Sequence, residues 1–383
     1  MHGLSLKSSM NNLVFITLLT GAFIEHSWAV DNDKIPPKKM YDNCPKPIVE
    51  PYVGPLQIES KYVQSDATKA TLKESLSDNS KVVKAQIEQF GKQLVVFSDY
   101  YVRESSAKGV LALSCVHAAL GAWAEAGALL TKDVSKTGVA VRKWTLASVS
   151  MVVYKLNALS AEEFQLTQTE NDWLITLADR VFDDYRARLD PGFKYFNNHD
   201  YWTAWALLST SMATESNRHV DYVYAVLARA LKQVKLSDDG SYGWLPNEIG
   251  RSQLALNYMH YALNPLIMVA YYADETGYTL TQNDEATLAA MVRFVSAAEL
   301  TPKKVTDIFA AKQDPVPSYK LAWLIPYLHQ HPSDEAARAL FRARDGQVDG
   351  YSQLGGLIEP LFSLSGSAAR APKGKAAKQG LNQ

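Results

Sequence analysis

The chain has 383 residues, enough for one large domain or two ordinary ones, and 47% of them are hydrophobic, so a sizeable core is possible. Its formal net charge of -1 excludes the strongly basic class of nucleic-acid-binding proteins, so an anionic ligand would need a local basic patch. Eight Trp and twenty Tyr supply aromatic faces that stack on sugar rings, although most are expected to pack in or beside the core.

The N-terminus has the pattern of an export signal. Lys7 gives a short positive region, residues 13–24 are mostly apolar, and Ser27-Trp28-Ala29 offers small residues at the cleavage positions. The apolar stretch is too short for a bilayer, which needs about twenty residues. A buried helix is the alternative, and the position at the very start of the chain disfavours it. We expect residues 1–29 to be a signal peptide and the mature protein to begin at about Val30, in the periplasm and without membrane insertion.

The chain has two cysteines, Cys44 and Cys115. Export would place them in an oxidising compartment, where a disulfide can form. Cys44 lies in a proline-rich lead-in and Cys115 in an apolar helical run, so a bridge would attach the lead-in to the helical body. Two unpaired thiols are the alternative.

Beyond Asp66 the spacing of apolar residues is helical almost throughout. Asp66 is expected to open the first long helix, Ser160 with Glu163 has the form of a capping box, and Pro191-Gly192 interrupts the series. The expected helices span residues 67–101, 109–130, 139–156, 162–188, 201–214, 220–234, 254–276, 285–298, 318–331 and 333–341.

This pattern predicts an all-α fold, because strands neither alternate with the helices nor form a hairpin series. Successive antiparallel helical pairs favour an α/α toroid, an incomplete ring of helical hairpins, over residues 30–365. A globin-like or solenoid arrangement is the alternative. A toroid gathers loops and helix starts around a central cleft, which suits a polymeric ligand. Residues 366–383 are rich in Ala, Gly and Lys, and we expect a disordered basic tail.

The run 197–202, Asn-Asn-His-Asp-Tyr-Trp, lies where the helix 201–214 is expected to start. Asn198 is a natural N-cap there, and His199 could equally be an exposed histidine of the first turn. A helix start also offers free N–H groups to an anion. Asn198 and His199 are therefore candidates for holding a carboxylate.

Arg251 and Tyr258 are seven residues apart, which on a helix places both side chains on one face about 10 Å apart. A surface arginine and a packed tyrosine would fit the same spacing. Tyr261 and His260 add polar aromatic surface in the next turn. Lys61 and the basic–aromatic cluster 142–144 are by themselves more typical of a solvated surface. The carboxylate pairs 183–184 and 238–239 point apart and do not form an acid–base couple.

Together these residues resemble the exported mannuronate-specific alginate lyases, polysaccharide lyase family 5. The resemblance rests on the run 197–202, on Ser60-Lys61-Tyr62 followed by residues 65–67, on residues 122–130, on Arg251 seven before Tyr258, and on residues 261–266. These five segments occur in the expected order over roughly residues 40–330. One departure is Tyr258-Met259-His260-Tyr261, where the family has Tyr-His-Asn-Tyr.

The resemblance implies an α/α toroid, a Cys44–Cys115 bridge, and the catalytic set Asn198, His199, Arg251 and Tyr258. It also makes Lys61 a substrate-binding residue. We expect nearby aromatic side chains to contact the sugar rings as well: Tyr62, Tyr195, Trp202, Trp205 and Tyr261.

The implied reaction is β-elimination of a 4-linked mannuronate without a metal or cofactor. Asn198, His199 and Arg251 would neutralise the C5 carboxylate, and Tyr258 would act as base and acid. His199 as the base and Tyr258 as the acid is the alternative. The expected partner is an acidic polysaccharide, alginate or polymannuronate, bound by a monomer that could associate with alginate secretion machinery. A lyase for another uronate polymer, a non-catalytic polysaccharide-binding protein and a helical glycoside hydrolase are the competing functions.

Overall fold

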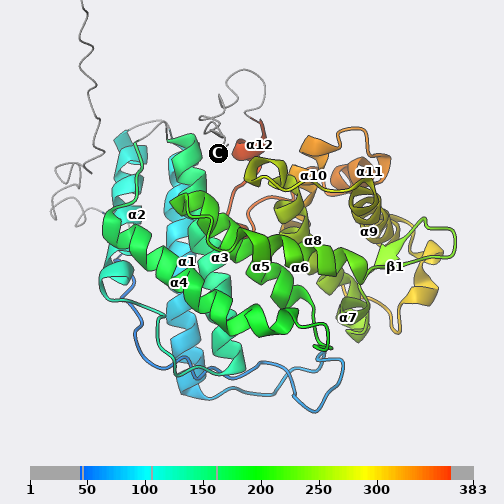
Figure 1. Ribbon diagram of the computed structural model, residues 1–383, viewed down its shortest axis with the longest axis horizontal. Coiled ribbons are helices and arrows are strands. Elements are labelled where there is room, and N and C mark those ends of the chain that lie inside the picture. Colours follow the sequence, from blue (N-terminus) through cyan, green and yellow to red (C-terminus); the bar gives the residue numbers. More distant parts are fainter. Residues whose placement is uncertain (1–43, 45–46, 105–106, 161–162, 364–383) are drawn as a thin grey trace, which may run out of the picture. The chain divides into compact units, whose positions relative to one another are not determined.

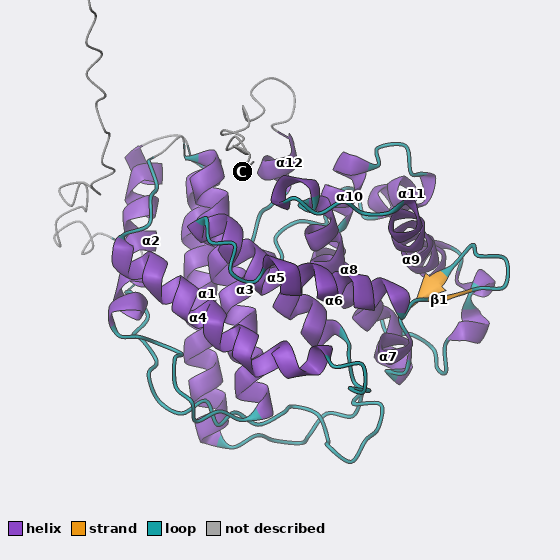
Figure 2. Cartoon of the chain, viewed as in Figure 1, coloured by secondary structure: helices purple, strands orange, loops and turns teal. Residues whose placement is uncertain are grey.

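Helices dominate the structure, a computed structural model that describes residues 44, 47–104, 107–160 and 163–363 (Figure 1, Figure 2). The α-helices of these residues are α1 (Asp78–Arg103), α2 (Ala107–Glu125), α3 (Lys136–Leu159), α4 (Gln168–Tyr185), α5 (Asn198–Thr214), α6 (Val220–Lys232), α7 (Pro246–Ile249), α8 (Ala255–Tyr271), α9 (Gln282–Leu300), α10 (Leu324–Gln330), α11 (Glu335–Ala343) and α12 (Glu359–Ser363). The 3-10 helices are η3 (Arg186–Leu189), η4 (Ser252–Leu254), η5 (Asp274–Thr276), η6 (Pro302–Lys304), η7 (Thr306–Ile308), η8 (Ser318–Leu321) and η9 (Ser352–Leu354).

Strands β1 (Lys235–Leu236) and β2 (Gly243–Trp244) pair antiparallel and form one small hairpin between α6 and α7. The prediction of an all-α chain is confirmed. The described helices include none that is long and apolar enough to cross a membrane. The predicted signal peptide (1–29) and basic tail (366–383) lie outside the described residues, as do the boundaries of the predicted domain.

Helices α3 and α5 form the centre of the packing. α3 contacts α1, α4 and α5, and α5 contacts α4, α6 and α8 as well. Figure 1 shows α1, α2 and α3 side by side. α3 is buried on nearly every face, and its apolar residues Val149, Val152 and Leu156 are fully buried. A charged side chain on this helix is therefore placed inside the protein.

Two predicted helix starts are wrong for the same reason, a local polar side chain that holds the chain in a turn. Residues 66–76 form a loop, in which the Asp66 carboxylate accepts hydrogen bonds from the N–H groups of residues 68, 70 and 71. α1 starts only after Ser77, its N-cap. Ser160 ends α3 rather than starting the next helix, and α4 begins after Thr167, which forms the capping box with Glu170.

The predicted disulfide is confirmed. Cys44 is bonded to Cys115 of α2, with their Cα atoms 5.8 Å apart. Gln93 strengthens the attachment of the lead-in, since its amide accepts a hydrogen bond from Val49 N and donates one to Pro47 O. The chain that follows the disulfide is thus fixed against α1 and α2 before it reaches residues 61 and 62.

The lead-in then crosses the start of α3 at very close range. Leu56 N donates to Asp133 O, and Ser135 Oγ accepts from Ile58 N and donates to Ile58 O. Gly138 is required at this crossing, because a Cβ there would lie 1.9 Å from Leu56 O. The crossing fixes the segment that continues to Tyr62.

Candidate active site

The start of α5 is built by Asn197, not by Asn198. Asn197 is the N-cap, and its Oδ1 accepts the His199 N–H at 3.0 Å while Asp200 Oδ2 accepts the Asn197 N–H at 2.9 Å. α5 thus begins three residues before the predicted start at residue 201. The correction matters, because the Asn198 side chain is free of the capping role that we expected of it.

Asn198 is instead held by Glu248, a carboxyl group of the short helix α7. Glu248 Oε1 accepts the Asn198 N–H at 2.7 Å, and Glu248 Oε2 accepts from Asn198 Nδ2 at 2.8 Å. Glu248 is fully buried, and burial raises its pKa to about 7 although both hydrogen bonds favour the charged form. The amide keeps one further N–H and its carbonyl oxygen for other partners.

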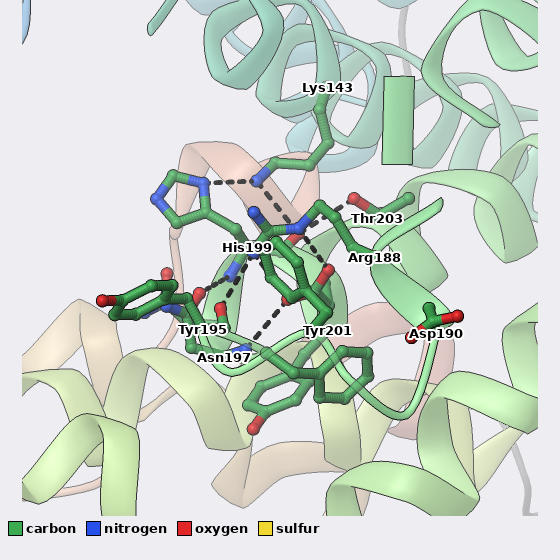
Figure 3. Close-up of polar contacts among 12 residues, drawn as sticks. Lys143, Arg188, Asp190, Tyr195, Asn197, His199, Tyr201 and Thr203 are labelled. Atoms are coloured by element: carbon green, nitrogen blue, oxygen red, sulfur yellow. Dashed lines mark hydrogen bonds and ion pairs between the residues drawn. The ribbon is translucent and has the colours of Figure 1, made fainter. Parts of the chain in front are cut away.

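His199 lies against Lys143 of α3. Lys143 Nζ is 3.2 Å from His199 Nδ1 and donates to His199 O at 3.2 Å, as Figure 3 shows. Burial, with the positive charges of Lys143, Arg188 and Arg251 around it, holds the pKa of His199 well below its usual range. The imidazole is therefore neutral at neutral pH.

Arg188 completes this half of the site. Its Nε and Nη2 donate to the two oxygens of Asp200 at 2.6 and 2.8 Å. Nη2 also donates to Tyr195 O at 3.0 Å. This bidentate pair fixes the carboxylate that caps α5 and leaves the loop of Tyr195 tied to the same helix start.

Arg251 and Tyr258 are in direct contact, which corrects the prediction of two helical turns between them. Arg251 precedes η4 instead of lying on α8, and its Cζ lies 4.0 Å from the centroid of the Tyr258 ring. Tyr258 donates a hydrogen bond to Tyr62 Oη at 3.0 Å. Arg251 Nε is buried, and no described residue accepts a hydrogen bond from it. The pair thus offers a phenol and an available guanidinium N–H.

Burial raises the pKa of Tyr258 above its ordinary value, and the hydrogen bond to Tyr62 raises it further, while the charge of Arg251 lowers it. Burial has a larger effect on this pKa than the charge of Arg251 has. Tyr258 is therefore a phenol at neutral pH, with the phenolate as a minor form.

Glu248 joins the start of α5, which carries Asn198 and His199, to the segment that carries Arg251. Its carboxylate holds Asn198, and its backbone oxygen accepts the Arg251 N–H at 3.2 Å. The charge of Arg251 also acts on both Glu248 and His199. Amide, imidazole, guanidinium and phenol are thus brought together from α5, the α7–η4 segment and α8.

The other predicted substrate contacts divide into accessible and buried residues. Lys61 is exposed beside the Tyr62 ring, with Nζ 5.0 Å from its centroid, and Tyr195 is 73% exposed. Tyr261 is half-buried, and its Oη accepts from Gln353 Nε2 at 3.3 Å. These residues are accessible to a ligand.

Trp202 and Trp205 are fully buried, so the prediction that they contact the sugar rings is wrong. α5 is covered by α3 on one side and α8 on the other, and Trp202 Nε1 donates to Tyr261 O at 3.1 Å. His260 is also fully buried, against Trp323, and adds no polar surface. These side chains belong to the core on which the site residues pack.

A cavity of about 370 Å³ lies beside this constellation. Its lining includes Trp144, whose ring centroid is 5.7 Å from that of His199. Residues of α1, α3, the η8 segment and η9 form the remaining wall. Its polar and aromatic lining residues include Glu88, Lys92, Tyr319, Tyr351 and Gln353.

Four charged residues of the site were not predicted, and one of them is Arg188, described above. Lys143 and Glu248 hold His199 and Asn198. Lys320 donates to Asn257 Oδ1 at 2.5 Å, with Nζ 5.9 Å from the Tyr261 ring centroid. Burial and the charge of Lys61 lower the pKa of Lys320 to about 8. Lys61 and Lys320 thus make a local positive region near Tyr62 and Tyr261.

The sequence pattern of the alginate lyase family matches residues 57–305. The chain is 32% identical over 330 residues to an alginate lyase of Pseudomonas putida, covering 84% of this chain and 86% of that protein. It is 31% identical over 340 residues to an alginate lyase of Azotobacter vinelandii, covering 87% of each.

The fold matches the crystal structure of alginate lyase A1-III from Sphingomonas species A1, with a TM-score of 0.62, 18% identity, and coverage of 82% of this chain and 84% of that one. A variant of alginate lyase A1-III complexed with a tetrasaccharide matches with a TM-score of 0.64 and 17% identity, over 86% of this chain and 90% of that one. This likeness confirms the predicted α/α toroid. The chain belongs to the alginate lyase family, polysaccharide lyase family 5.

Proposed function

We propose that this chain is an alginate lyase that cleaves mannuronate-containing polymer by β-elimination. Its family and its relatives, which are named alginate lyases, support action on an acidic uronate polysaccharide. The observation that carries the proposal is the link through Glu248. This residue holds the amide of Asn198 and the backbone of Arg251, so that carboxylate-binding groups stand beside the phenol of Tyr258.

The first step is neutralisation of the sugar carboxylate. The C5 proton is a very weak acid while the neighbouring carboxylate keeps its charge. The free N–H of Asn198, the imidazole of His199 and the unused N–H of Arg251 are donors of the kind that stabilise a developing enolate. These groups lie in a largely buried setting, where such donors act more strongly than in water.

The second step is proton transfer by Tyr258. The phenolate removes the C5 proton, the C5–H electron pair becomes the C4–C5 double bond, and the C4–O4 bond breaks. The phenol formed then returns its proton to O4. Arg251 stabilises the phenolate through its charge at 4.0 Å from the ring. In mannuronate the C5 proton and O4 lie on the same face, so one phenol serves both, which supports mannuronate as the substrate.

The positive region around Lys61 and Lys320 suits the carboxylates of neighbouring sugars. Tyr62, Tyr195 and Tyr261 provide accessible aromatic faces or phenols for the rings. We propose the periplasm as the site of action, from the predicted signal peptide. The monomeric state and an association with secretion machinery stay predictions.

Incubation with mannuronate-rich alginate, guluronate-rich alginate and a glycosaminoglycan tests the proposal. We expect ultraviolet-absorbing unsaturated product to form fastest from the mannuronate-rich polymer. Product from the glycosaminoglycan alone would indicate a lyase for another uronate polymer. Binding of alginate with no unsaturated product from any polymer would indicate a polysaccharide-binding protein instead.

A further inference from the structure

Lys143 is a lysine in the interior of the protein with its ammonium group directed at one residue. It lies on α3, its side chain is fully buried, and both of its hydrogen bonds go to His199. One joins Nζ to the ring Nδ1 at 3.2 Å and the other reaches the backbone oxygen at 3.2 Å (Figure 3). Burying a lysine costs free energy, so hydrogen bonding confined to one candidate catalytic residue calls for an explanation.

The surroundings of Lys143 act on its charge in opposite directions. The rings of Trp144 and Tyr185 each lie 5.0 Å from Nζ, and the carboxylate of Asp200 attracts the ammonium form. Arg188 repels it, and burial lowers the pKa of Lys143 well below the ordinary value. Lysine is nonetheless the stronger base of the pair by about four pKa units in water, and the pKa of His199 is lowered as well. A proton shared by these two groups is therefore held by Lys143, whose Nζ also donates a hydrogen bond to His199 O.

An ammonium group can only donate hydrogen bonds. His199 Nδ1, 3.2 Å from it, must then be an acceptor and carry no proton. A neutral imidazole has one N–H, so its proton lies on Nε2. No described residue forms a hydrogen bond with His199 Nε2, and His199 is half-buried, so this N–H is left for a ligand.

We propose that Lys143 is a positioning residue that holds His199 in the Nε2–H tautomer, so that His199 meets the sugar carboxylate as a neutral hydrogen-bond donor. The inference rests on the proposed function and deepens it. Nε2 with its proton in place has no lone pair for the C5 proton. His199 is thereby excluded as the base, and proton transfer is left to Tyr258.

The tautomer is measured directly by two-dimensional ¹H–¹⁵N NMR of the full chain labelled with ¹⁵N-histidine. The His199 signals are identified by their loss in His199→Gln. In the wild type we expect an unprotonated Nδ1 and a protonated Nε2. A protonated Nδ1 in the wild type overturns the proposal without any need for a Lys143 variant.

Lys143→Met tests the role of the ammonium group, with Lys155→Met as the matched control. Lys155 is a second fully buried lysine of α3, and its ammonium group pairs with Asp99 at 2.6 Å and donates to Gly355 O instead of to His199. We expect mixed tautomers of His199 in Lys143→Met and unchanged His199 signals in Lys155→Met. Unchanged signals in a folded Lys143→Met would contradict the inference, and circular dichroism checks folding.

Activity provides a second readout. In Lys143→Met we expect kcat on polymannuronate to fall by about 10- to 100-fold, the range for losing a group that orients a histidine. His199→Gln keeps an amide N–H near the place of Nε2–H and should retain clearly more activity than His199→Ala. Equal loss in the two His199 variants would indicate a base and overturn the proposal. If the wild type forms no unsaturated product, the proposed function fails, while the NMR spectrum still decides the tautomer.

Discussion

The carboxylate of Glu248 holds Asn198 by two hydrogen bonds at once, from the backbone N–H at 2.7 Å and from the side-chain amide at 2.8 Å. One of the two amide hydrogens of Asn198 is thereby fixed, which sets the direction of the other. Water cannot readily replace these hydrogen bonds, since Glu248 is 0% and Asn198 3% exposed. The relationship has consequences for stability as well as for the chemistry.

The ionisation of Glu248 should make the protein less stable as the pH rises. Its pKa is raised from 4.5 to about 7, so the folded state binds more protons than the unfolded state between these values. The associated stabilisation is complete below pH 4.5 and is lost as the pH passes 7, a change of about 3 kcal/mol. In Glu248→Gln this contribution to the pH dependence should vanish. Urea unfolding at a series of pH values measures it, and an unchanged slope in the variant would contradict the assignment.

Tyr258→Phe should abolish turnover while leaving substrate binding largely intact. The change removes one oxygen, and the ring that packs against Arg251 remains. We expect kcat to fall by about a thousandfold or more, within the range for general acid–base groups. Tyr278→Phe, in a tyrosine that stacks on Tyr224 away from the site, is the control. Stopped assays with mannuronate oligomers and binding by calorimetry measure the two effects. A Tyr258→Phe enzyme with wild-type kcat removes this residue from the mechanism.

The rate should increase with pH across the neutral and mildly alkaline range. The pKa of Tyr258 lies above its ordinary value, so the phenolate fraction rises about tenfold per pH unit below it. The hydrogen bond donated to Tyr62 stabilises the neutral phenol, so Tyr62→Phe should shift the rise of kcat to lower pH. Profiles of kcat against pH for both proteins provide the measurement. A shift to higher pH would show that Tyr62 stabilises the phenolate instead.

Lys61→Gln should weaken binding rather than chemistry. Lys61 is exposed, and its charge acts on Lys320, so the two lysines form one positive region for carboxylates. We expect KM to rise by about three- to tenfold with kcat nearly unchanged, and the difference to shrink as salt screens the charges. Lys81→Gln, in an exposed lysine paired with Asp78 at 2.9 Å, is the control. An equal effect of both changes would point to net charge and not to this region.

The fold was predictable because periodicity and composition determine it. The helical series and the all-α class follow from long apolar patterns, and the Cys44–Cys115 bridge was one of two outcomes for the cysteine pair and the one that the family resemblance implied. The errors lie at helix starts, because one polar side chain decides where the first turn of a helix begins. Asp66 and Ser160 were misjudged because the competing turn or cap differs from the prediction by only a few hydrogen bonds.

The site was predictable to the extent that its residues stand in recognisable runs. Asn198 and His199 share one run, but their supports are distant in the sequence and chemically ordinary. Glu248 is one of 40 acidic residues, and nothing in its neighbourhood marks it as buried. Lys143 belongs to the cluster 142–144, for which we expected a solvated surface, and this expectation is wrong because α3 is buried on nearly every face. Trp202 was assigned to the cleft because a sequence does not show which face of α5 is covered.

The close crossing at Gly138 and the contact made by Lys143 belong to the same helix. Through Gly138, α3 sets the course of the segment that ends at Tyr62, and through Lys143 it sets the ring of His199. Neither position touches the reacting sugar in the proposed reaction, yet each governs a group that does. Presence of the Asn-His and Arg-Tyr pairs in a related chain is therefore an insufficient criterion for activity, and positions 138 and 143 have to be inspected with them.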